Sequence, residues 1–184
     1  MLIAAEPDGL EQAAQDLRGL GAPVETVAVN LAEHEGVHQV YDKIKASGRP
    51  ADAIAINAGV GGDFRETDLA EEINLINLNV ISTVHLAKHM AQDMTARGSG
   101  RILFTASVAS LMPAPFEAVY GASKAFIFSF PEALRNEMKE TGVTALLPGP
   151  TETDFFHRAD MDDTMVRGAR RPTPPMWRGT GSRR

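Results

Sequence analysis

Short apolar runs alternate with longer stretches of helical periodicity along most of this chain. The runs are four to six residues long, and several are rich in β-branched residues, which is typical of buried strands. They occupy residues 2–5, 24–29, 53–57, 101–106 and 143–147. Apolar positions with a helical period fill the intervals, at residues 10–17, 37–44, 69–94 and 120–138. Strands that alternate with helices of this length predict an α/β fold, a doubly wound parallel sheet covered by helices on both faces.

Glycine marks the predicted end of each helix. Gly19 and Gly21 follow the first periodic stretch, and Gly48 follows the second. Gly98 and Gly142 close the third and fourth. A glycine just past the last periodic residue is a common helix stop, because glycine adopts the left-handed conformation found there.

Composition places the chain among ordinary globular proteins. Its 184 residues suit one domain, with 43% apolar and 23% charged residues. Cysteine is absent, which excludes disulfides, thiolate nucleophiles and cysteine-ligated metals. No apolar run reaches the length of a membrane span, and the first residues lack the basic and apolar regions of a signal peptide, so we expect a cytoplasmic protein with no membrane partner.

Charge divides the chain into two parts. The net charge is −6, yet residues 164–184 hold six arginines and no acidic residue, together with several prolines and glycines. Such a segment cannot bury enough surface to offset its ordering entropy, so we predict a folded domain over residues 1–163 and a disordered basic tail over 164–184. A basic tail can touch nucleic acid, but Trp177 stands alone among the arginines, and a solvated tail without a nucleic-acid partner is the expectation.

Polar residues follow the predicted strands where ligands bind in parallel sheets. Asn57 and Gly59 follow the third run, Ser107 follows the fourth, and Pro148 follows the fifth. Ligands of open α/β sheets sit beyond the carboxyl ends of the strands, so these residues are candidates for a site. Each alone is equally typical of an ordinary turn.

Tyr120 and Lys124 are four residues apart on a predicted helix and share one face of it. A free tyrosine has a pKa of about 10 and is a poor proton donor and acceptor at neutral pH. A nearby cation favours the phenolate, so we expect Lys124 to lower the pKa of Tyr120 and make it an acid–base group.

These elements together resemble the short-chain dehydrogenase/reductase family, over about residues 2–156. The resemblance rests on their order and spacing rather than on any one of them. The elements are Asn57-Ala58-Gly59, Asn79, Ser107, Tyr120-Gly121-Ala122-Ser123-Lys124, and Pro148-Gly149 with Thr153.

The resemblance implies four catalytic residues. Tyr120 would exchange a proton with an alcohol or carbonyl oxygen, and Ser107 would hold that oxygen. Lys124 would tune Tyr120 and bind the ribose of a nicotinamide cofactor. Asn79 would hold a water that leads to Lys124; without the resemblance, a helix-interior asparagine that bends the helix is the simpler interpretation.

The resemblance also implies NAD or NADP as cofactor, a small alcohol or carbonyl compound as substrate, and a homo-oligomer. Glu6 follows the first predicted strand, where an acidic residue favours NAD slightly, and it is equally typical of a solvated loop. The implied cofactor-binding residues are Asn30, Asn57, Ala58, Gly59, Tyr120, Lys124, Pro148, Gly149, Thr151 and Thr153.

The chain departs from the family pattern at both ends. The family's first strand and glycine-rich turn would precede Leu2, and its last strand would follow Asp163, so we expect a truncated form with unpaired strand edges in the middle of the sheet. Because that turn holds the cofactor pyrophosphate, three hypotheses stay open. The chain is an NAD(P)-dependent oxidoreductase, a catalytically silent remnant of that fold, or an interaction module that acts through its basic tail.

Histidines give a weaker signal. His85 and His89 are four residues apart on a predicted helix, a spacing that can bind a metal ion. No third ligand of suitable spacing is visible, so we expect ordinary helix histidines and no metal site. His34, His38 and His157 form no recognisable pattern in the sequence.

Overall fold

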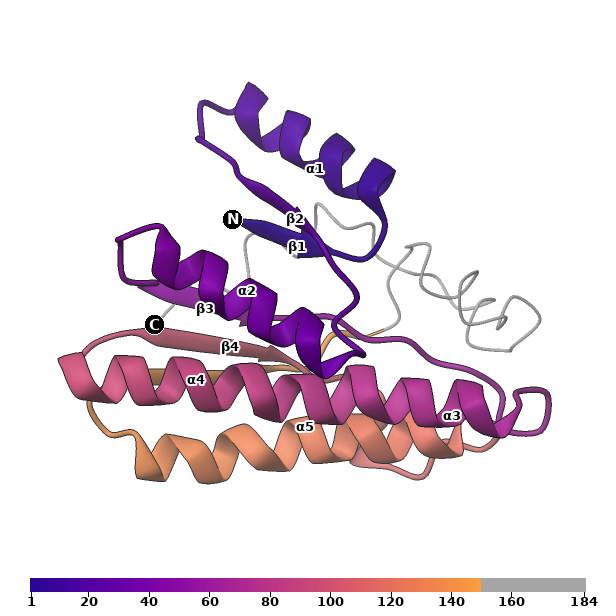
Figure 1. Cartoon of the computed structure of the whole chain (residues 1–184). Coiled ribbons are helices and arrows are strands. Elements are labelled where there is room, and N and C mark those ends of the chain that lie inside the picture. The colour runs from indigo at the N-terminus through magenta and orange to yellow at the C-terminus, as the bar shows by residue number, and fades with distance from the viewer. Residues whose placement is uncertain (150–184) are drawn as a thin grey trace.

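The computed structural model describes residues 1–149, in which strands and helices alternate (Figure 1). The strands are β1 (Leu2–Ala4), β2 (Thr26–Ala28), β3 (Ala53–Ile56), β4 (Arg101–Thr105) and β5 (Gly142–Leu146). The helices are α1 (Pro7–Gly19), α2 (His34–Ala46), α3 (Leu69–Ile76), α4 (Ser82–Arg97) and α5 (Ala118–Glu137). A π-helix η1 (Asn77–Ile81) joins α3 to α4, and a short 3-10 helix η2 (Val108–Leu111) follows β4. The predicted strands and helices are therefore present, with boundaries shifted by only a few residues.

All described strands pair in parallel, which confirms the predicted α/β architecture. They form two sheets: β1 pairs with β2, while β3, β4 and β5 pair in that order. Among residues 1–149, β1 and β3 are not hydrogen-bonded to each other. The interruption between β1 and β3 lies where the sequence predicts unpaired strand edges.

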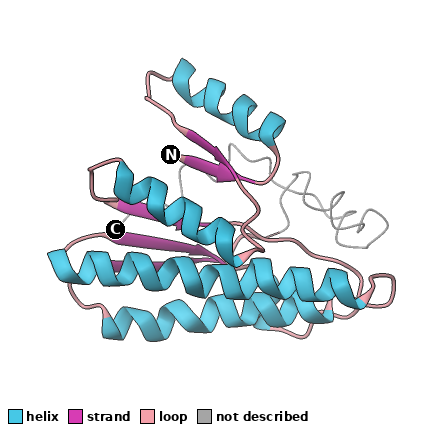
Figure 2. Ribbon diagram, in the orientation of Figure 1, coloured by secondary structure: helices cyan, strands magenta, loops and turns pink. Residues whose placement is uncertain are grey.

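The main core lies between the three-stranded sheet and the helices α4 and α5, which run side by side across one face of it (Figure 2). Phe104 on β4 is completely buried and meets Phe130 of α5 edge to face, with ring centroids 5.7 Å apart. Met90 and Met94 of α4 fill the space beside Ile102. The alternation of buried and half-buried residues along β4 shows that one face of this sheet is packed more tightly than the other.

Helix α1 packs on the two-stranded sheet and buries less. Its fully buried residues are Leu10 and Ala14. From β1, Ile3 reaches the main core as a partly buried residue. The helix begins at Pro7 and ends before Gly21, whose positive φ of 86° matches the predicted glycine stop.

The long predicted helix over residues 69–94 is present but not uniform. Asp68 caps its start, accepting a 2.9 Å hydrogen bond from the Glu71 amide while the Glu71 carboxylate accepts from the Asp68 amide. Gly98 ends it in the left-handed conformation, as predicted. The interruption by the π-helix was not predicted, because the wider hydrogen-bond spacing leaves no periodic signal in the sequence.

Some predictions concern residues outside the described range. The proposed domain boundary at 163, the tail over 164–184, and the candidates Thr151 and Thr153 all lie there. Within the described range, no helix combines the length and apolarity that a membrane crossing needs.

Candidate active site

Helix α5 presents Tyr120 and Lys124 on its buried face. The two side chains are one turn apart and continue into a buried stripe with Ile127 and Pro131. Tyr120 is 7% exposed and Lys124 is 6% exposed. The predicted sharing of one helix face is therefore confirmed, and both polar groups sit in surroundings that exclude most water.

Ser107 lies next to Tyr120, although it comes from the end of β4. The Ser107 side chain hydrogen-bonds with the Tyr120 side chain. Its hydroxyl oxygen also accepts a 3.2 Å hydrogen bond from the Ala109 amide and so caps η2. Ser110, in the same turn, donates a 2.8 Å hydrogen bond to the Lys124 carbonyl, which fastens η2 to α5. The structure thus brings together the hydroxyl groups that the sequence assigned to one site.

The Lys124 ammonium points back toward the end of β4. It donates a 3.0 Å hydrogen bond to the Thr105 carbonyl and lies 5.8 Å from the centre of the Tyr120 ring. An ammonium has three N–H donors. Within residues 1–149, the two others have no hydrogen-bond acceptor, so this buried group can still bind a ligand.

The titration behaviour differs from the expectation. Burial raises the pKa of Tyr120, the nearby Glu117 carboxylate raises it further, and only the hydrogen bond with Ser107 acts to lower it. Burial also lowers the pKa of Lys124 to about 8. The predicted depression of the Tyr120 pKa is therefore wrong, because burial and the Glu117 carboxylate raise this pKa more than the Ser107 hydrogen bond lowers it.

Asn79 occupies the π-helix and is 1% exposed. Its amide nitrogen donates to the Val60 carbonyl and to the Ser123 hydroxyl, both at 2.9 Å, and its amide oxygen accepts from the Val60 N–H at 2.9 Å. Ser123 in turn donates a 2.7 Å hydrogen bond to the Tyr120 carbonyl. Asn79 therefore ties the loop after β3 to the helix that carries Tyr120 and Lys124.

Gly59 lets that loop approach the site. A Cβ atom at this position would lie 3.2 Å from the Asn79 amide oxygen and 3.3 Å from the Lys124 ammonium nitrogen, closer than most side chains tolerate. Asn57 and Ala58, just before it, are exposed. These three residues follow the carboxyl end of β3, and Gly59 lies beside Asn79 and Lys124.

The loop after β5 contacts the turn that follows β4. Val108 donates a 3.1 Å hydrogen bond to the Pro148 carbonyl, so the turn after β5 lies against the turn that holds Ser107. Gly149 is the last described residue.

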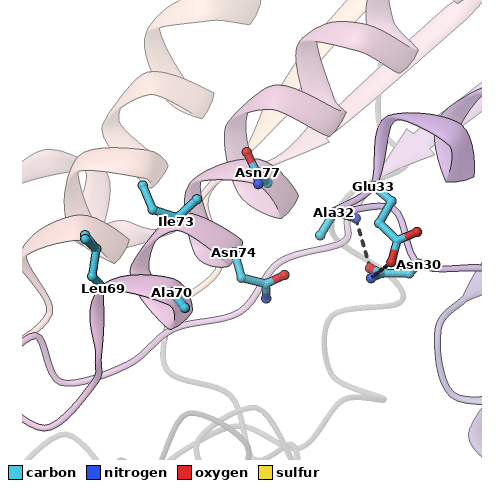
Figure 3. Close-up of a pocket in the computed structure, with 8 residues that line it drawn as sticks. All are labelled: Asn30, Ala32, Glu33, Leu69, Ala70, Ile73, Asn74 and Asn77. Atoms are coloured by element: carbon cyan, nitrogen blue, oxygen red, sulfur yellow. Dashed lines mark hydrogen bonds between the residues drawn. The ribbon is translucent and has the colours of Figure 1, made fainter.

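Asn30 lies apart from this group, in an open pocket of about 580 Å³ between the start of α2 and the helix α3 (Figure 3). Its side-chain oxygen accepts from the Ala32 amide at 3.0 Å, and its nitrogen donates to Glu33 at 3.0 Å. Its amide is thus engaged in shaping the loop. The lining residues are Asn30, Ala32, Glu33, Leu69, Ala70, Ile73, Asn74 and Asn77.

Apolar side chains stand exposed beside the Ser107 turn. Leu111 is 60% exposed and Met112 is 69% exposed. Phe116 has a φ of 71°, which is rare for a residue with a large side chain, and its ring lies 4.4 Å from the Arg65 guanidinium. Phe155 and Phe156, also considered as pocket walls, lie outside the described range.

Sequence reasoning missed the supporting residues. Ser123, Ser110 and the Thr105 carbonyl hold the reactive groups in place, yet each resembles an ordinary helix or strand residue. The position of Ser123 could have indicated its supporting role, because it lies between Tyr120 and Lys124 on the same helix.

The described residues near Lys124 fit the nicotinamide and ribose end of a cofactor. The free N–H groups of Lys124, the hydroxyl of Ser107 and the closely packed Gly59 suit a ribose and a nicotinamide. In the family pattern the glycine-rich turn that holds the pyrophosphate would precede Leu2, so the described residues do not include that turn.

Comparison with known proteins points to one family. The family described as short chain dehydrogenase matches residues 1–164. A short-chain dehydrogenase from Sphingobium yanoikuyae in complex with NADPH has 26% identity and a TM-score of 0.83, over 94% of this chain and 68% of that one. L-sorbose reductase from Gluconobacter frateurii, complexed with NADPH and L-sorbose, has 32% identity and a TM-score of 0.73, over 80% of this chain and 59% of that one.

Curated relatives match a shorter stretch. Ketoacyl reductase HetN from Nostoc sp. is 36% identical over 92 residues, which is 49% of this chain and 32% of the relative. Human 17-beta-hydroxysteroid dehydrogenase type 1 is 38% identical over 87 residues, 46% of this chain and 26% of the relative. The matches thus cover about a third or less of these relatives' length.

Proposed function

The chain belongs to the short-chain dehydrogenase family, and from this premise we propose that it is an NAD(P)-dependent oxidoreductase that interconverts an alcohol and a ketone or aldehyde. The observation that carries the proposal is the hydrogen bond between the Tyr120 and Ser107 side chains, next to the buried ammonium of Lys124. Two N–H groups of this ammonium have no acceptor among the described residues. Solved relatives of this chain are complexed with NADPH, which supports the same cofactor class.

In the reductive direction, Tyr120 is the proton donor. Its raised pKa keeps the phenol protonated at neutral pH, so it can deliver a proton to a carbonyl oxygen. Ser107 hydrogen-bonds to the same oxygen and stabilises the negative charge that develops on it. A nicotinamide held by these residues would supply the hydride for the carbonyl carbon, and with the proton from Tyr120 this would complete the reduction to an alcohol.

Lys124 and Asn79 support the transfer in different ways. The free N–H groups of Lys124 bind ribose hydroxyls, and its positive charge stabilises the phenolate that remains after Tyr120 has donated. Both N–H groups of the Asn79 amide are already used, so a water in the relay would bind its oxygen. Asn79 is thus first a positioning residue and second a candidate relay group.

The remaining cofactor contacts follow the groove. Asn57, Ala58 and Gly59 would line the adenosine side of the cofactor, with Asn30 beyond them. Pro148 and Gly149 would face the nicotinamide, and the family resemblance adds Thr151 and Thr153, which lie outside the described residues. The exposed Leu111, Met112 and Phe116 favour an apolar portion on the substrate.

The test is a titration with NADH and NADPH read by nicotinamide fluorescence, followed by turnover measurements with the Tyr120→Phe variant. We expect saturable cofactor binding and a loss of kcat by about 10² to 10⁴-fold in the variant, with little change in cofactor affinity. Tyr41→Phe is a matched control, because the chain has two tyrosines and Tyr41 is on another helix.

The second candidate, a silent remnant of the fold, is favoured by the break between β1 and β3 among the described residues. It predicts no saturable binding at millimolar cofactor, and that outcome would refute the oxidoreductase proposal for this chain. The third, an interaction module acting through residues 164–184, predicts salt-sensitive retention on nucleic acid that deletion of those residues abolishes.

A further inference from the structure

Four histidines gather where α2 packs against α4. His34 and His38 are one turn apart on α2, and His85 and His89 are one turn apart on α4. We call these four residues the histidine cluster. The rings of His34 and His85 stack with centroids 4.2 Å apart, and His38 lies 4.6 Å from His34 and 4.7 Å from His85.

Two nitrogen atoms of the histidine cluster are buried without a partner. Among the described residues, Nδ1 of His85 and Nε2 of His89 are shielded from solvent and make no hydrogen bond. A buried polar atom without a partner is unfavourable and is often explained by an ion or water at the site. This observation is independent of the ring spacing and also indicates a ligand.

The spacing suits a metal ion shared by both helices. One ligand nitrogen from each of His34, His38 and His85 can be chosen so that all three lie within 4.8 Å of one another. Tetrahedral zinc with bonds of about 2.0–2.1 Å needs ligand atoms roughly 3.4 Å apart, a gap that small side-chain rotations close. His34 is exposed and the other two are half-buried, so an ion can enter from solvent.

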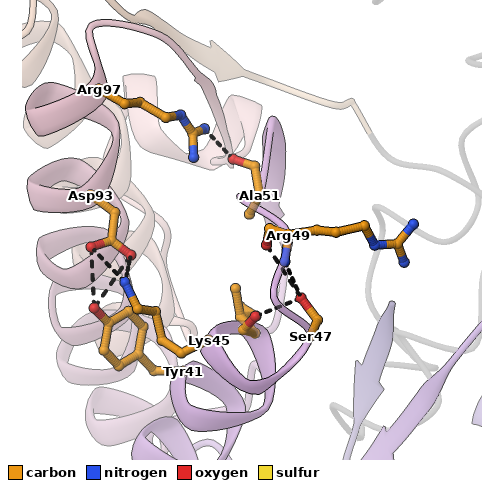
Figure 4. Close-up of polar contacts among 8 residues, drawn as sticks. Tyr41, Lys45, Ser47, Arg49, Ala51, Asp93 and Arg97 are labelled. Carbon is orange, nitrogen blue, oxygen red and sulfur yellow. Dashed lines mark hydrogen bonds and ion pairs between the residues drawn. The ribbon is translucent and has the colours of Figure 1, made fainter.

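The surroundings hold the histidine cluster in place. Tyr41 stacks on His89 with ring centroids 4.2 Å apart, and its hydroxyl lies 3.3 Å from the Asp93 carboxylate. Lys45 forms a 3.2 Å ion pair with the same carboxylate (Figure 4). These contacts fix α2 against α4 one to two turns beyond the histidines.

We propose that His34, His38 and His85 bind a divalent transition metal ion of the zinc type, which clamps α2 to α4. Imidazole nitrogens suit Zn²⁺, Co²⁺, Ni²⁺ and Cu²⁺ rather than Mg²⁺ or Ca²⁺. The site shares no residue with Asn79, Ser107, Tyr120 or Lys124, so it is structural and independent of the proposed oxidoreductase chemistry.

The test uses the full chain without a polyhistidine tag. Zinc chloride is titrated calorimetrically, and cobalt chloride is titrated with visible absorption as a readout of nitrogen coordination. We expect one ion per chain and a melting temperature higher by roughly 5–10 °C at a zinc concentration a hundredfold above the Kd. Absence of saturable binding by either ion would overturn the proposal.

Variants on the two helices distinguish a clamp from binding by one helix. His38→Gln on α2 and His85→Gln on α4 should each weaken zinc binding at least about a hundredfold, since even outer-shell partners contribute ten- to a hundredfold. If only substitutions at His85 and His89 weaken binding, the ion is held by α4 alone and the clamp is refuted.

Two further variants guard against misleading results. His34→Gln changes an exposed side chain and should fold normally, so its loss of zinc affinity tests the site even if the more buried variants do not fold. His157→Gln removes the remaining histidine of the chain and should leave affinity unchanged. Equal loss in His157→Gln would also contradict the assignment.

Discussion

The two sheets of this protein differ in what they bury. The N-terminal unit, formed by β1, α1 and β2, contributes Leu10 and Ala14 as its fully buried apolar residues. The three-stranded unit, formed by β3, β4 and β5 with α3, α4 and α5, contains Phe104, Ile102 and most of the remaining core. The large hydrophobic contribution to stability therefore lies in the second unit.

The same unit also holds the polar groups of the site. Asn79, Ser123 and Lys124 are almost completely buried there, whereas no fully buried polar side chain occurs in the described residues before Glu72. A well-packed core can carry such groups, because each is hydrogen-bonded and its burial penalty is offset by the apolar contacts around it. The comparison teaches that packing and chemistry are concentrated in one half of the molecule, and the following experiments test this.

Phe104→Ala should have the largest effect. Removal of a completely buried phenylalanine should lower the free energy of unfolding by about 3–5 kcal/mol, measured by urea denaturation. Phe64→Ala is the control, because Phe64 is 53% exposed and should change stability by less than about 0.5 kcal/mol. Should Phe104→Ala fail to fold, Phe104→Leu, with an expected loss of about 1.5 kcal/mol, gives the same test.

Lys124→Met should reveal how much the burial of the Lys124 ammonium lowers the free energy of unfolding. The pKa of Lys124 is about 8 in the folded protein and 10.5 as its ordinary value, so between these pH values the unfolded chain binds more protons. Below pH 8 the ammonium is charged in both states and its burial lowers the free energy of unfolding in full. As the pH rises to about 10.5, the free energy of unfolding of the native protein should increase by on the order of 3 kcal/mol relative to Lys124→Met. Urea denaturation at several pH values measures this.

The control for that experiment is Lys88→Met, since Lys88 is exposed on α4. Its stability difference from the native protein should not vary with pH in the same range. A constant difference for Lys124→Met as well would show that the ammonium is solvated.

Leu10→Ala should have the smallest effect, about 2 kcal/mol, and it should be local. Hydrogen exchange should speed up at the Val29 amide, which donates to the Ala4 carbonyl between β1 and β2, and remain unchanged in β4. Leu20→Ala, at a residue 75% exposed, serves as control. Equal acceleration in both sheets would show that the two units unfold together and would break the comparison.

The sequence predicts the elements of this fold well because each carries a local signal. Apolar runs place β3 and β4 within a residue or two, and Gly98 places the end of α4. The division into two sheets follows from a departure from the family pattern, which sequence reasoning also detects. The π-helix at Asn79 was missed, because backbone hydrogen-bond spacing is decided by tertiary contacts such as those with Val60 and Ser123.

The sequence predicts that Ser107, Tyr120 and Lys124 lie close together, but not their electrostatics. The spacing of Tyr120 and Lys124 gives a shared helix face, but how deeply that face is buried depends on the whole fold. Burial then reversed the expected direction of the Tyr120 pKa. The histidine cluster was missed for a similar reason, since His34 and His85 are brought together only when α2 packs on α4.

Gly36 lies between the open pocket at Asn30 and the histidine cluster. A Cβ atom there would lie 2.0 Å from the Asn30 carbonyl oxygen, so the first turn of α2 rests directly on the backbone of the loop beside the open pocket. This turn stands between His34 and His38. A ligand that displaced this loop would also press on the first turn of α2, and by thermodynamic linkage that ligand and the proposed metal ion would then change each other's affinity by the same factor.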